Sequence, residues 1–209
     1  MDAQAWDDRY SSEDRLFSGN PNGVLIAEVE GLAPGRALDL GCGEGADAVW
    51  LAERGWHVTA VDISQVALDR AAEAAGADGA AEGLGDRIAW TRADLTAEPP
   101  PPGPFDLVSA QYFPLPKEEG HAALKALLAA VAPGGTLLYV GHHIEDLGPQ
   151  QWREVDPTDY YWPADVAEVL KAMPDGEWTV LTDEVRPRPS VPEGAHHTRD
   201  TVLRARRQR

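Results

Sequence analysis

A glycine-rich segment followed by an acid is the part of the sequence best suited to chemistry. Residues 39–45 read Asp-Leu-Gly-Cys-Gly-Glu-Gly and lie between a short apolar run and a helical pattern. Glycines at such a turn let the backbone bend tightly and approach a ligand, because they have no Cβ. Asp62 ends the next apolar run, where a carboxylate can accept two hydrogen bonds from a ribose diol. The arrangement therefore predicts a bound nucleoside.

The charge of this segment indicates which nucleoside. Residues 41–46 also satisfy the dinucleotide pattern G-x-G-x-x-A, but a dinucleotide places its pyrophosphate at the helix N-terminus. No Lys or Arg occurs between Ala37 and Glu53, whereas three acids do: Asp39, Glu44 and Asp47. These acids disfavour a phosphate and favour a phosphate-free nucleoside with a cationic sulfonium, which is S-adenosylmethionine.

The elements that must position these residues alternate in type. Short apolar runs of strand length occur at 37–40, 58–61, 88–91, 105–108 and 136–140, and helical patterns occur at 46–54, 65–75, 117–132 and 164–173. Two further strand-like runs, 178–185 and 198–205, follow a proline-flanked helix and are joined by a proline-rich turn. We expect an α/β fold: one doubly wound, mostly parallel sheet with helices on both faces and an antiparallel C-terminal edge pair.

The sequence resembles the class I, Rossmann-like S-adenosylmethionine-dependent methyltransferases over nearly its whole length. The resemblance implies that the first motif, with Asp39, Gly41, Cys42 and Gly43, holds the amino-acid end of the cofactor. It further implies a set of contacts to the rest of the cofactor: Asp62 to the ribose, Ile63, Asp94 and Leu95 to the adenine, and Gln111 to the methionine portion.

The first residues are similar to those of small bacterial methyltransferases of the tellurite-resistance, thiopurine and thiol types. In those proteins this region covers the cofactor as a lid, so the resemblance implies that Trp6 and Tyr10 contact the cofactor. The whole chain then forms one domain: a lid and helix at 1–34, a cofactor-binding core at 35–145, and an acceptor loop, helix and terminal strands at 146–209.

Candidate acceptor-binding and catalytic residues follow the fourth and fifth predicted strands. His142 and His143 lie at the carboxyl end of the sheet, where one imidazole could take a proton from a nucleophile. Because adjacent strand residues point to opposite faces, we expect no shared metal and predict no metal site. The candidate acceptor wall consists of aromatic residues: Tyr112, Phe113, Trp152, Tyr160 and Tyr161. Each of these residues could instead be structural.

Composition narrows the class of acceptor. The formal net charge is −17, and the stretch from Arg186 onward carries +5, which leaves −22 on the part of the chain that precedes it. Such a body disfavours nucleic acid, because phosphate contacts supply most of its affinity for proteins. The chain also lacks the Asn or Asp followed by two prolines and an aromatic that marks many nitrogen methyltransferases, since residues 109–114 read Ser-Ala-Gln-Tyr-Phe-Pro.

The sequence thus predicts methyl transfer from S-adenosylmethionine to a small-molecule nucleophile. The alternatives are an NAD-dependent oxidoreductase and a non-catalytic S-adenosylmethionine-binding protein. A single cysteine, the lack of an apolar N-terminal run and the lack of a long apolar stretch favour a cytoplasmic protein without a membrane partner. We expect a monomer or a homodimer.

Overall fold

The computed structural model describes residues 1–76, 83–146, 156–174, 176–188 and 197–209. Its strands are β1 (Arg36–Leu40), β2 (His57–Asp62), β3 (Ile88–Arg92), β4 (Phe105–Gln111), β5 (Val131–His142), β6 (Trp178–Pro187) and β7 (Arg199–Arg207). Its helices are α1 (Ala3–Ser11), α2 (Gly23–Val29), α3 (Ala46–Glu53), α4 (Gln65–Gly76), α5 (Ala122–Ala130) and α7 (Pro163–Lys171). Three short 3₁₀ turns are η1 (Gly85–Arg87), η2 (Ile144–Asp146) and η3 (Pro157–Asp159).

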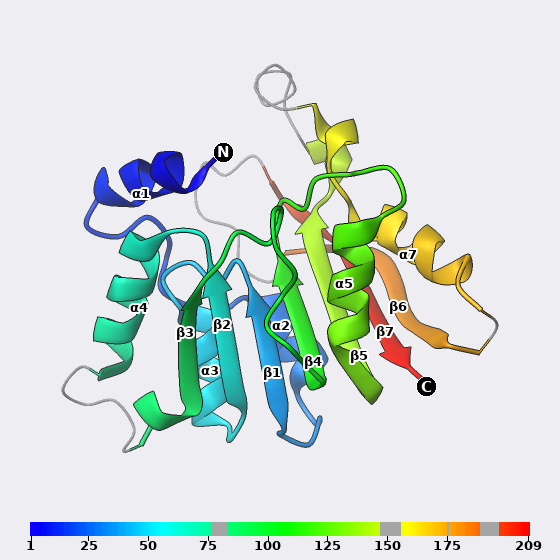
Figure 1. The fold of residues 1–209 in the computed structure, drawn as a ribbon, viewed down its shortest axis with the longest axis horizontal. Helices are drawn as coiled ribbons and strands as arrows, with labels where there is room; N and C mark the ends of the chain where they lie inside the picture. Colours follow the sequence, from blue (N-terminus) through cyan, green and yellow to red (C-terminus); the bar gives the residue numbers. More distant parts are fainter. Residues whose placement is uncertain (77–82, 147–155, 175, 189–196) are drawn as a thin grey trace.

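The seven strands form one sheet in the order β3-β2-β1-β4-β5-β7-β6 (Figure 1). The first five strands are parallel, whereas β7 runs antiparallel to both β5 and β6. The chain order reverses between β1 and β4, which in open α/β sheets is the point where ligands bind at the carboxyl ends of the strands. The predicted fold class is confirmed.

Helices cover both faces of this sheet. Alternate residues of each strand point to opposite faces of the sheet. Leu38 of β1 and Tyr139 of β5 pack with α5 and α7, whereas their neighbours Ala37 and Val140 pack with α2 and α3. This alternation follows from the twofold period of a strand. Both faces are buried, so the central strands read as continuous apolar runs rather than as alternating ones.

One predicted boundary is wrong. The helical pattern at 117–132 contains a shorter helix, α5, which begins after His121 in a left-handed conformation (φ 58°). Strand β5 starts at Val131, before Pro133. The pairing of β5 with β4 jumps from Phe105↔Val131 to Leu107↔Thr136, and an irregularity of this kind lets a strand contain a proline and two glycines.

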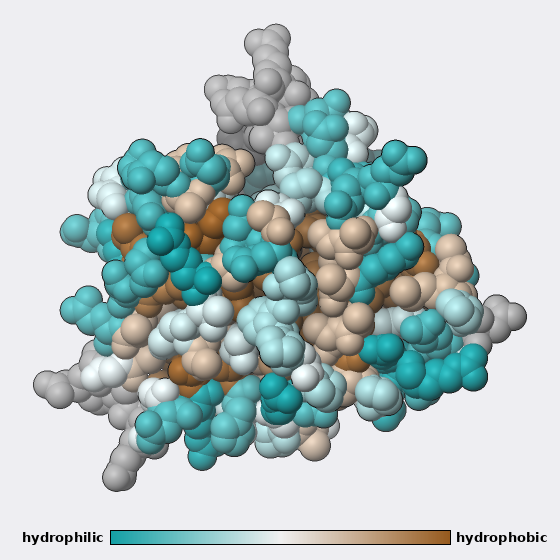
Figure 2. Space-filling view, viewed as in Figure 1, coloured by the Kyte–Doolittle hydropathy of each residue, from teal (hydrophilic) through white to brown (hydrophobic). Residues whose placement is uncertain are grey.

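The face of the molecule seen in Figure 2 is mostly polar. Hydrophilic residues predominate on it, and hydrophobic residues show between them in separate patches. No helix among the described residues has the length and apolar character needed to cross a membrane.

Candidate active site

The glycine loop between β1 and α3 is tied to the next strand of the sheet. The backbone N–H of Cys42 donates to the carbonyl of Val61 at 3.0 Å. Gly41 and Gly43 have φ of 66° and 53°, values that favour glycine. A Cβ on Gly41 would lie 2.8 Å from the ring of Phe113, and a Cβ on Gly43 would lie 2.9 Å from the hydroxyl of Tyr10. Close approach therefore requires glycine at both positions.

Asp62 fixes this loop from the end of β2. Its Oδ2 accepts from the N–H of Gly43 at 2.8 Å, and its Oδ1 accepts from the N–H of Ser64 at 2.9 Å. Burial raises the pKa of the carboxyl, although these two hydrogen bonds and one from Ile63 oppose that shift. Each carboxylate oxygen has a second lone pair, so Asp62 can still accept the two hydroxyls of a ribose.

Two more acids lie in the same buried region. Burial and the charges of Asp47 and Asp62 raise the pKa of Asp39 well above its ordinary value. Asp47 accepts from the N–H and the side-chain amide of Asn22 at 2.7 and 2.8 Å. An anion here would face three closely spaced carboxyl groups in a poorly solvated site, so the acidic lining disfavours a pyrophosphate.

Two buried acceptor atoms of this region lack a donor within the described part of the chain. They are Oδ2 of Asp39 and Oε1 of Gln111, whose residues are 2% and 9% exposed. Asp39 and Gln111 lie on the neighbouring strands β1 and β4. A buried acceptor costs free energy unless it is hydrogen-bonded. Both atoms therefore suit a ligand that donates hydrogen bonds and carries positive charge, as the ammonium end of S-adenosylmethionine does.

The N-terminal segment covers the glycine loop. Helix α1 lies beside α4, beyond the carboxyl ends of the strands (Figure 1). Tyr10 is 3% exposed and packs between Trp6 and Phe17, with ring centroids 5.9 and 6.1 Å away. The carboxylate of Glu44 accepts from the N–H groups of Leu16 and Phe17 at 3.2 and 3.1 Å.

Asp7 joins this segment to the cofactor site, and the sequence reasoning missed it. Its Oδ1 accepts from the hydroxyl of Ser64 at 2.6 Å and from the N–H of Val66 at 3.2 Å. Asp7 thereby caps the N-terminus of α4. The N–H of Ser64 also donates to Asp62. The position of Asp7 next to Trp6 was the only hint in the sequence that it belongs to the site. Local patterns do not reveal that a residue of α1 caps α4, because the two helices lie far apart in the sequence.

Among the described residues, the hydrogen bonds of the other predicted cofactor residues, Ile63, Asp94 and Leu95, do not involve the glycine loop. Ile63 follows Asp62 and is half-buried. Oδ1 of Asp94 accepts from the N–H and hydroxyl of Thr96, at 2.9 and 2.6 Å. Leu95 is 5% exposed and belongs to the core on the α5 and α7 face. Its burial favours a packing role.

The predicted acceptor residues separate into two groups. Tyr112 and Phe113 follow β4 directly, and the ring of Phe113 lies beside Gly41 of the glycine loop. Tyr161 is instead 4% exposed in the core, and its hydroxyl pairs with His121 at 2.5 Å, so its position favours packing over acceptor contact. Tyr160 forms a bridge with Pro116, and Trp152 lies outside the described residues.

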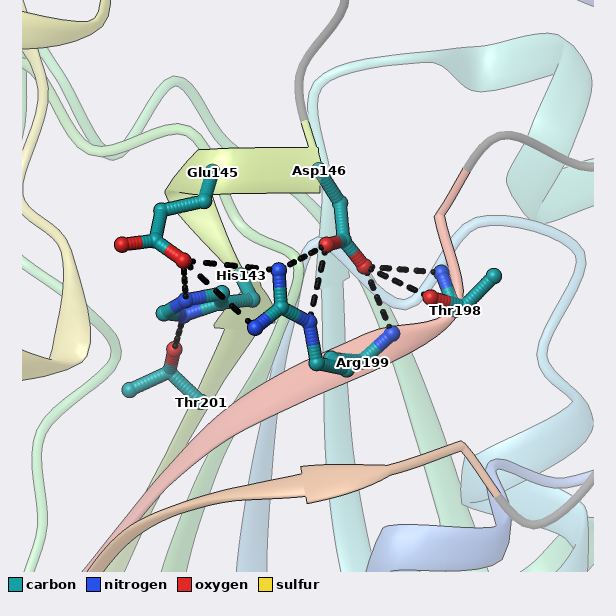
Figure 3. Close-up of polar contacts among 6 residues, drawn as sticks. All are labelled: His143, Glu145, Asp146, Thr198, Arg199 and Thr201. Atoms are coloured by element: carbon teal, nitrogen blue, oxygen red, sulfur yellow. Dashed lines mark hydrogen bonds and ion pairs between the residues drawn. The ribbon is translucent and has the colours of Figure 1, made fainter.

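The two adjacent histidines differ in the partners of their ring nitrogens. His143 has both nitrogens engaged: Nε2 is 3.2 Å from Glu145 and Nδ1 is 3.2 Å from the hydroxyl of Thr201 (Figure 3). His142 lies on the opposite face, stacked on Tyr112 with centroids 4.4 Å apart. Its Nδ1 is buried without a hydrogen bond and lies 3.8 Å from Asp200. Of the two predicted bases, His142 has the freer ring. No described group of three or more potential ligands could hold a metal ion.

A second set of polar contacts in Figure 3 joins η2 to the start of β7. Asp146 accepts from the N–H and hydroxyl of Thr198, at 2.9 and 3.0 Å, and from the N–H and guanidinium of Arg199, at 2.8 and 2.5 Å. These bonds, chiefly the one from the Arg199 side chain, hold the pKa of Asp146 far below its ordinary value. The cluster fixes the two chain segments that flank the sheet at this end.

We expect the Asp146→Asn variant to be less stable than the wild type in a pH-dependent way. Because folding lowers the pKa of this carboxyl, its stabilising effect is present above the unfolded value of about 4 and is lost as the pH falls through the lower folded value. Thermal unfolding followed at several pH values should show the largest difference near pH 7 and a shrinking one below about pH 4. The exposed Asp86→Asn variant is the control, and a pH-independent difference would contradict the assignment.

Comparison with known proteins identifies the fold family. Residues 37–135 match a family described as a methyltransferase domain. An uncharacterised methyltransferase of Mycobacterium tuberculosis is 41% identical over 104 residues, which are 49% of this chain and 48% of that protein. The ubiquinone biosynthesis O-methyltransferase of Pseudomonas aeruginosa is 31% identical over 137 residues, 64% of this chain and 56% of that protein. The chain thus spans about half the length of these curated relatives.

A solved structure shows the same fold over nearly the whole chain. The N-methyltransferase NodS from Bradyrhizobium japonicum, in complex with S-adenosylhomocysteine, superposes with a TM-score of 0.69 at 18% identity, covering 99% of this chain and 98% of that one. At this identity the likeness shows the fold alone, whereas the match at 37–135 includes the glycine loop and Asp62. Residues 37–135 of this chain therefore match a methyltransferase domain, within a fold shared with Rossmann-like S-adenosylmethionine-dependent methyltransferases.

Proposed function

We propose that this protein transfers the methyl group of S-adenosylmethionine to a small-molecule nucleophile by direct displacement. The observation that carries the proposal is the buried, acidic glycine loop. Asp62 holds that loop and has lone pairs free for a ribose, and Asp39 presents an acceptor that has no donor among the described residues. This lining suits a cationic, phosphate-free nucleoside and disfavours the NAD hypothesis.

The chain's own residues then bind, orient and exclude water. When bound, S-adenosylmethionine supplies a methyl group already activated on a sulfonium, so alignment is the main contribution required of the protein, and alignment can supply several kcal/mol. We assign Asp62 to the ribose and Asp39 with Gln111 to the amino-acid end. The three glycines and Cys42 form the floor beneath them, and burial beside Asp39 raises the pKa of the Cys42 thiol, which disfavours a reactive thiolate.

The N-terminal segment acts as a lid in this proposal. Three contacts hold it against the cofactor site: Asp7 on the start of α4, Tyr10 over Gly43, and Glu44 on the backbone of residues 16–17. Aromatic faces beside a sulfonium add about 0.5–2 kcal/mol of attraction. Trp6 and Tyr10 are the aromatic residues of α1 that would supply them, and closure would exclude water from the transfer.

A small acceptor fits the remaining space and charge. The region between the lid, Tyr112 and Phe113, and His142 offers aromatic surface, and the guanidinium of Arg188 over Tyr112 is paired with Asp200. The part of the chain that precedes Arg186 carries a strong negative charge. A polyanion would be repelled from it. One relative is named a ubiquinone biosynthesis O-methyltransferase, which supports a small-molecule acceptor without fixing which atom is methylated.

Ligand titration and a transfer assay test the function together. We expect S-adenosylmethionine to bind at least 10-fold more tightly than NADH in calorimetry, because the acidic loop repels the pyrophosphate. Labelled S-adenosylmethionine is then offered with a panel of thiols, phenols, amines and halides. Comparable NADH binding would revive the oxidoreductase hypothesis, and tight cofactor binding without transfer to any acceptor would favour a non-catalytic binding protein.

A further inference from the structure

Three rings from distant parts of the chain stack at the carboxyl edge of the sheet. Tyr112 follows β4, His142 ends β5, and His197 precedes β7. The ring of His142 lies between the other two, with centroid separations of 4.4 Å to Tyr112 and 4.2 Å to His197 and interplanar angles of 29° and 7°. Stacking on both faces limits the rotation of the His142 ring and leaves only its edge to act.

A buried carboxylate faces one edge of that ring. Asp200 is 1% exposed, and its Oδ1 lies 3.8 Å from Nδ1 of His142 and 3.5 Å from Nε of Arg188. A hydrogen bond to Asp200 and its charge add to burial in raising the pKa of Tyr112, which Arg188 opposes. The groups facing His142 are therefore one acid, one guanidinium, one phenol and one imidazole.

Asp200 selects the tautomer of His142. A carboxylate beside Nδ1 favours a proton on that nitrogen, which leaves the lone pair on Nε2. Nε2 has no hydrogen-bond partner among the described residues and is not buried, and the side chain keeps 28% of its surface exposed. A separation of 3.8 Å is longer than a hydrogen bond, but such contacts commonly tighten when substrate binds.

We propose that His142 is the general base for a phenolic or enolic hydroxyl acceptor and that Asp200 is its positioning residue. This inference rests on the proposed function and names the acceptor class for it. Nε2 of His142 takes the hydroxyl proton while the acceptor oxygen bonds to the methyl carbon. The carbon–sulfur bond breaks with its electron pair remaining on sulfur, and the carboxylate of Asp200 offsets the charge gained by the imidazole.

The chemistry of nucleophiles leads to this acceptor class. A halide or thiolate is already anionic, and a neutral amine attacks through its lone pair before losing a proton, so neither needs a base at the moment of attack. A phenol has a pKa near 10, about 3 to 4 units above that of an imidazole, which is within reach of general-base catalysis. An alkyl alcohol is far less acidic. An imidazole fixed in position therefore accelerates methyl transfer most for phenols and enols.

The first test measures ionisation without methyl transfer. The probe is 4-nitrocatechol, whose absorbance reports loss of its proton, bound to the full chain in the presence of S-adenosylhomocysteine. We expect the wild type to raise the ionisation constant of the bound probe about 10-fold relative to the His142→Gln variant. The His143→Gln variant is the matched control, because both nitrogens of that ring are already engaged. Equal ionisation in all three proteins would overturn the proposal.

The second test compares a protonated acceptor with an ionised one. At pH 7.5 catechol is protonated, whereas 4-nitrophenol is largely ionised. We expect His142→Gln to lower kcat on catechol by about 10²–10⁴-fold and to leave the rate on 4-nitrophenolate within a few-fold of the wild type. We expect Asp200→Asn to lower kcat on catechol, with little change in KM, and to shift the acid limb of its pH profile. Equal losses on both acceptors would overturn the base assignment.

If a variant fails to fold, measurements on the wild-type protein alone still test the proposal. Its catechol rate should fall at acid pH, whereas its rate with iodide, which stays anionic over the whole pH range, should not follow the same curve. Transfer to iodide and 4-nitrophenolate without any transfer to catechol would overturn the base proposal but leave the methyltransferase function standing. No transfer to any of these acceptors or to the wider panel of thiols, amines and halides, with bound cofactor, would overturn both.

Discussion

Replacing Asp62 by Ala is expected to weaken S-adenosylmethionine binding by about 1.5–3 kcal/mol, which is roughly a 10- to 150-fold loss of affinity. The charged carboxylate would no longer accept the ribose hydroxyls. The same change also frees the N–H groups of Gly43 and Ser64, which Asp62 holds at 2.8 and 2.9 Å, so the glycine loop loses its anchor. Calorimetry with the purified chain measures the change.

Two companion variants separate recognition from folding in this experiment. Asp62→Asn keeps one acceptor oxygen but turns an amide donor toward backbone N–H groups, so we expect it to lose most of the affinity as well. Asp69→Ala removes an acid from the exposed side of α4, where its carboxylate accepts only from Gln65 at 2.8 Å, and should bind as the wild type does. Unchanged affinity in Asp62→Ala, with a folded protein, would remove Asp62 from the cofactor site.

Removing residues 1–17 is expected to lower kcat/KM by about 10²-fold while leaving the sheet folded, because misplacement of about 1 Å can cost this factor. Every strand begins after Phe17, and the sheet packs against helices that the deletion keeps. The deletion takes away Tyr10 over Gly43 and the two backbone N–H groups that donate to Glu44, which keeps its ion pair with Arg70. Cofactor and acceptor would then be held less closely. Cofactor exchange, measured by stopped flow, should become faster.

A single substitution tests the same closure without shortening the chain. Asp7→Ala removes the acceptor for the N–H of Val66 and the hydroxyl of Ser64, whereas the cap from Ser64 to the N–H of Ala67 remains. Loss of a capping bond typically costs about 1 kcal/mol of stability. Asp8→Ala is the matched control, because this neighbour on α1 is exposed and accepts only from Gln4, at 2.9 Å. Wild-type kinetics in both the deletion and Asp7→Ala would rule the lid out.

Local patterns were sufficient for the parts of the fold that depend on neighbouring residues. The run Asp39 to Gly45 predicted the turn between β1 and α3, and the apolar runs predicted the strands. The same reasoning failed at 117–132, where apolar residues continue through the end of α5 into β5. There the boundary is set by a strand irregularity opposite Phe105 and Leu107, which belong to another element.

The sequence by itself determined the nature of the cofactor, because its contacts cluster in short segments. The glycines, the three acids of the loop and the acid at the end of the second strand all lie between Asp39 and Asp62. The absence of basic residues from the glycine loop is readable without a structure. A binding motif made of residues close together in the sequence can be recognised without knowledge of the tertiary packing.

Only the tertiary structure decided which histidine is free and what stands beside it. His142 and His143 are equivalent in the sequence, yet their opposite directions at the end of β5 place one against Glu145 and Thr201 and the other against Tyr112 and Asp200. Strand β7, inserted antiparallel between β5 and β6, carries Asp200 to within 3.8 Å of a histidine that lies far from it in the sequence. Strand order is a property of packing between whole elements, so no local pattern contains it.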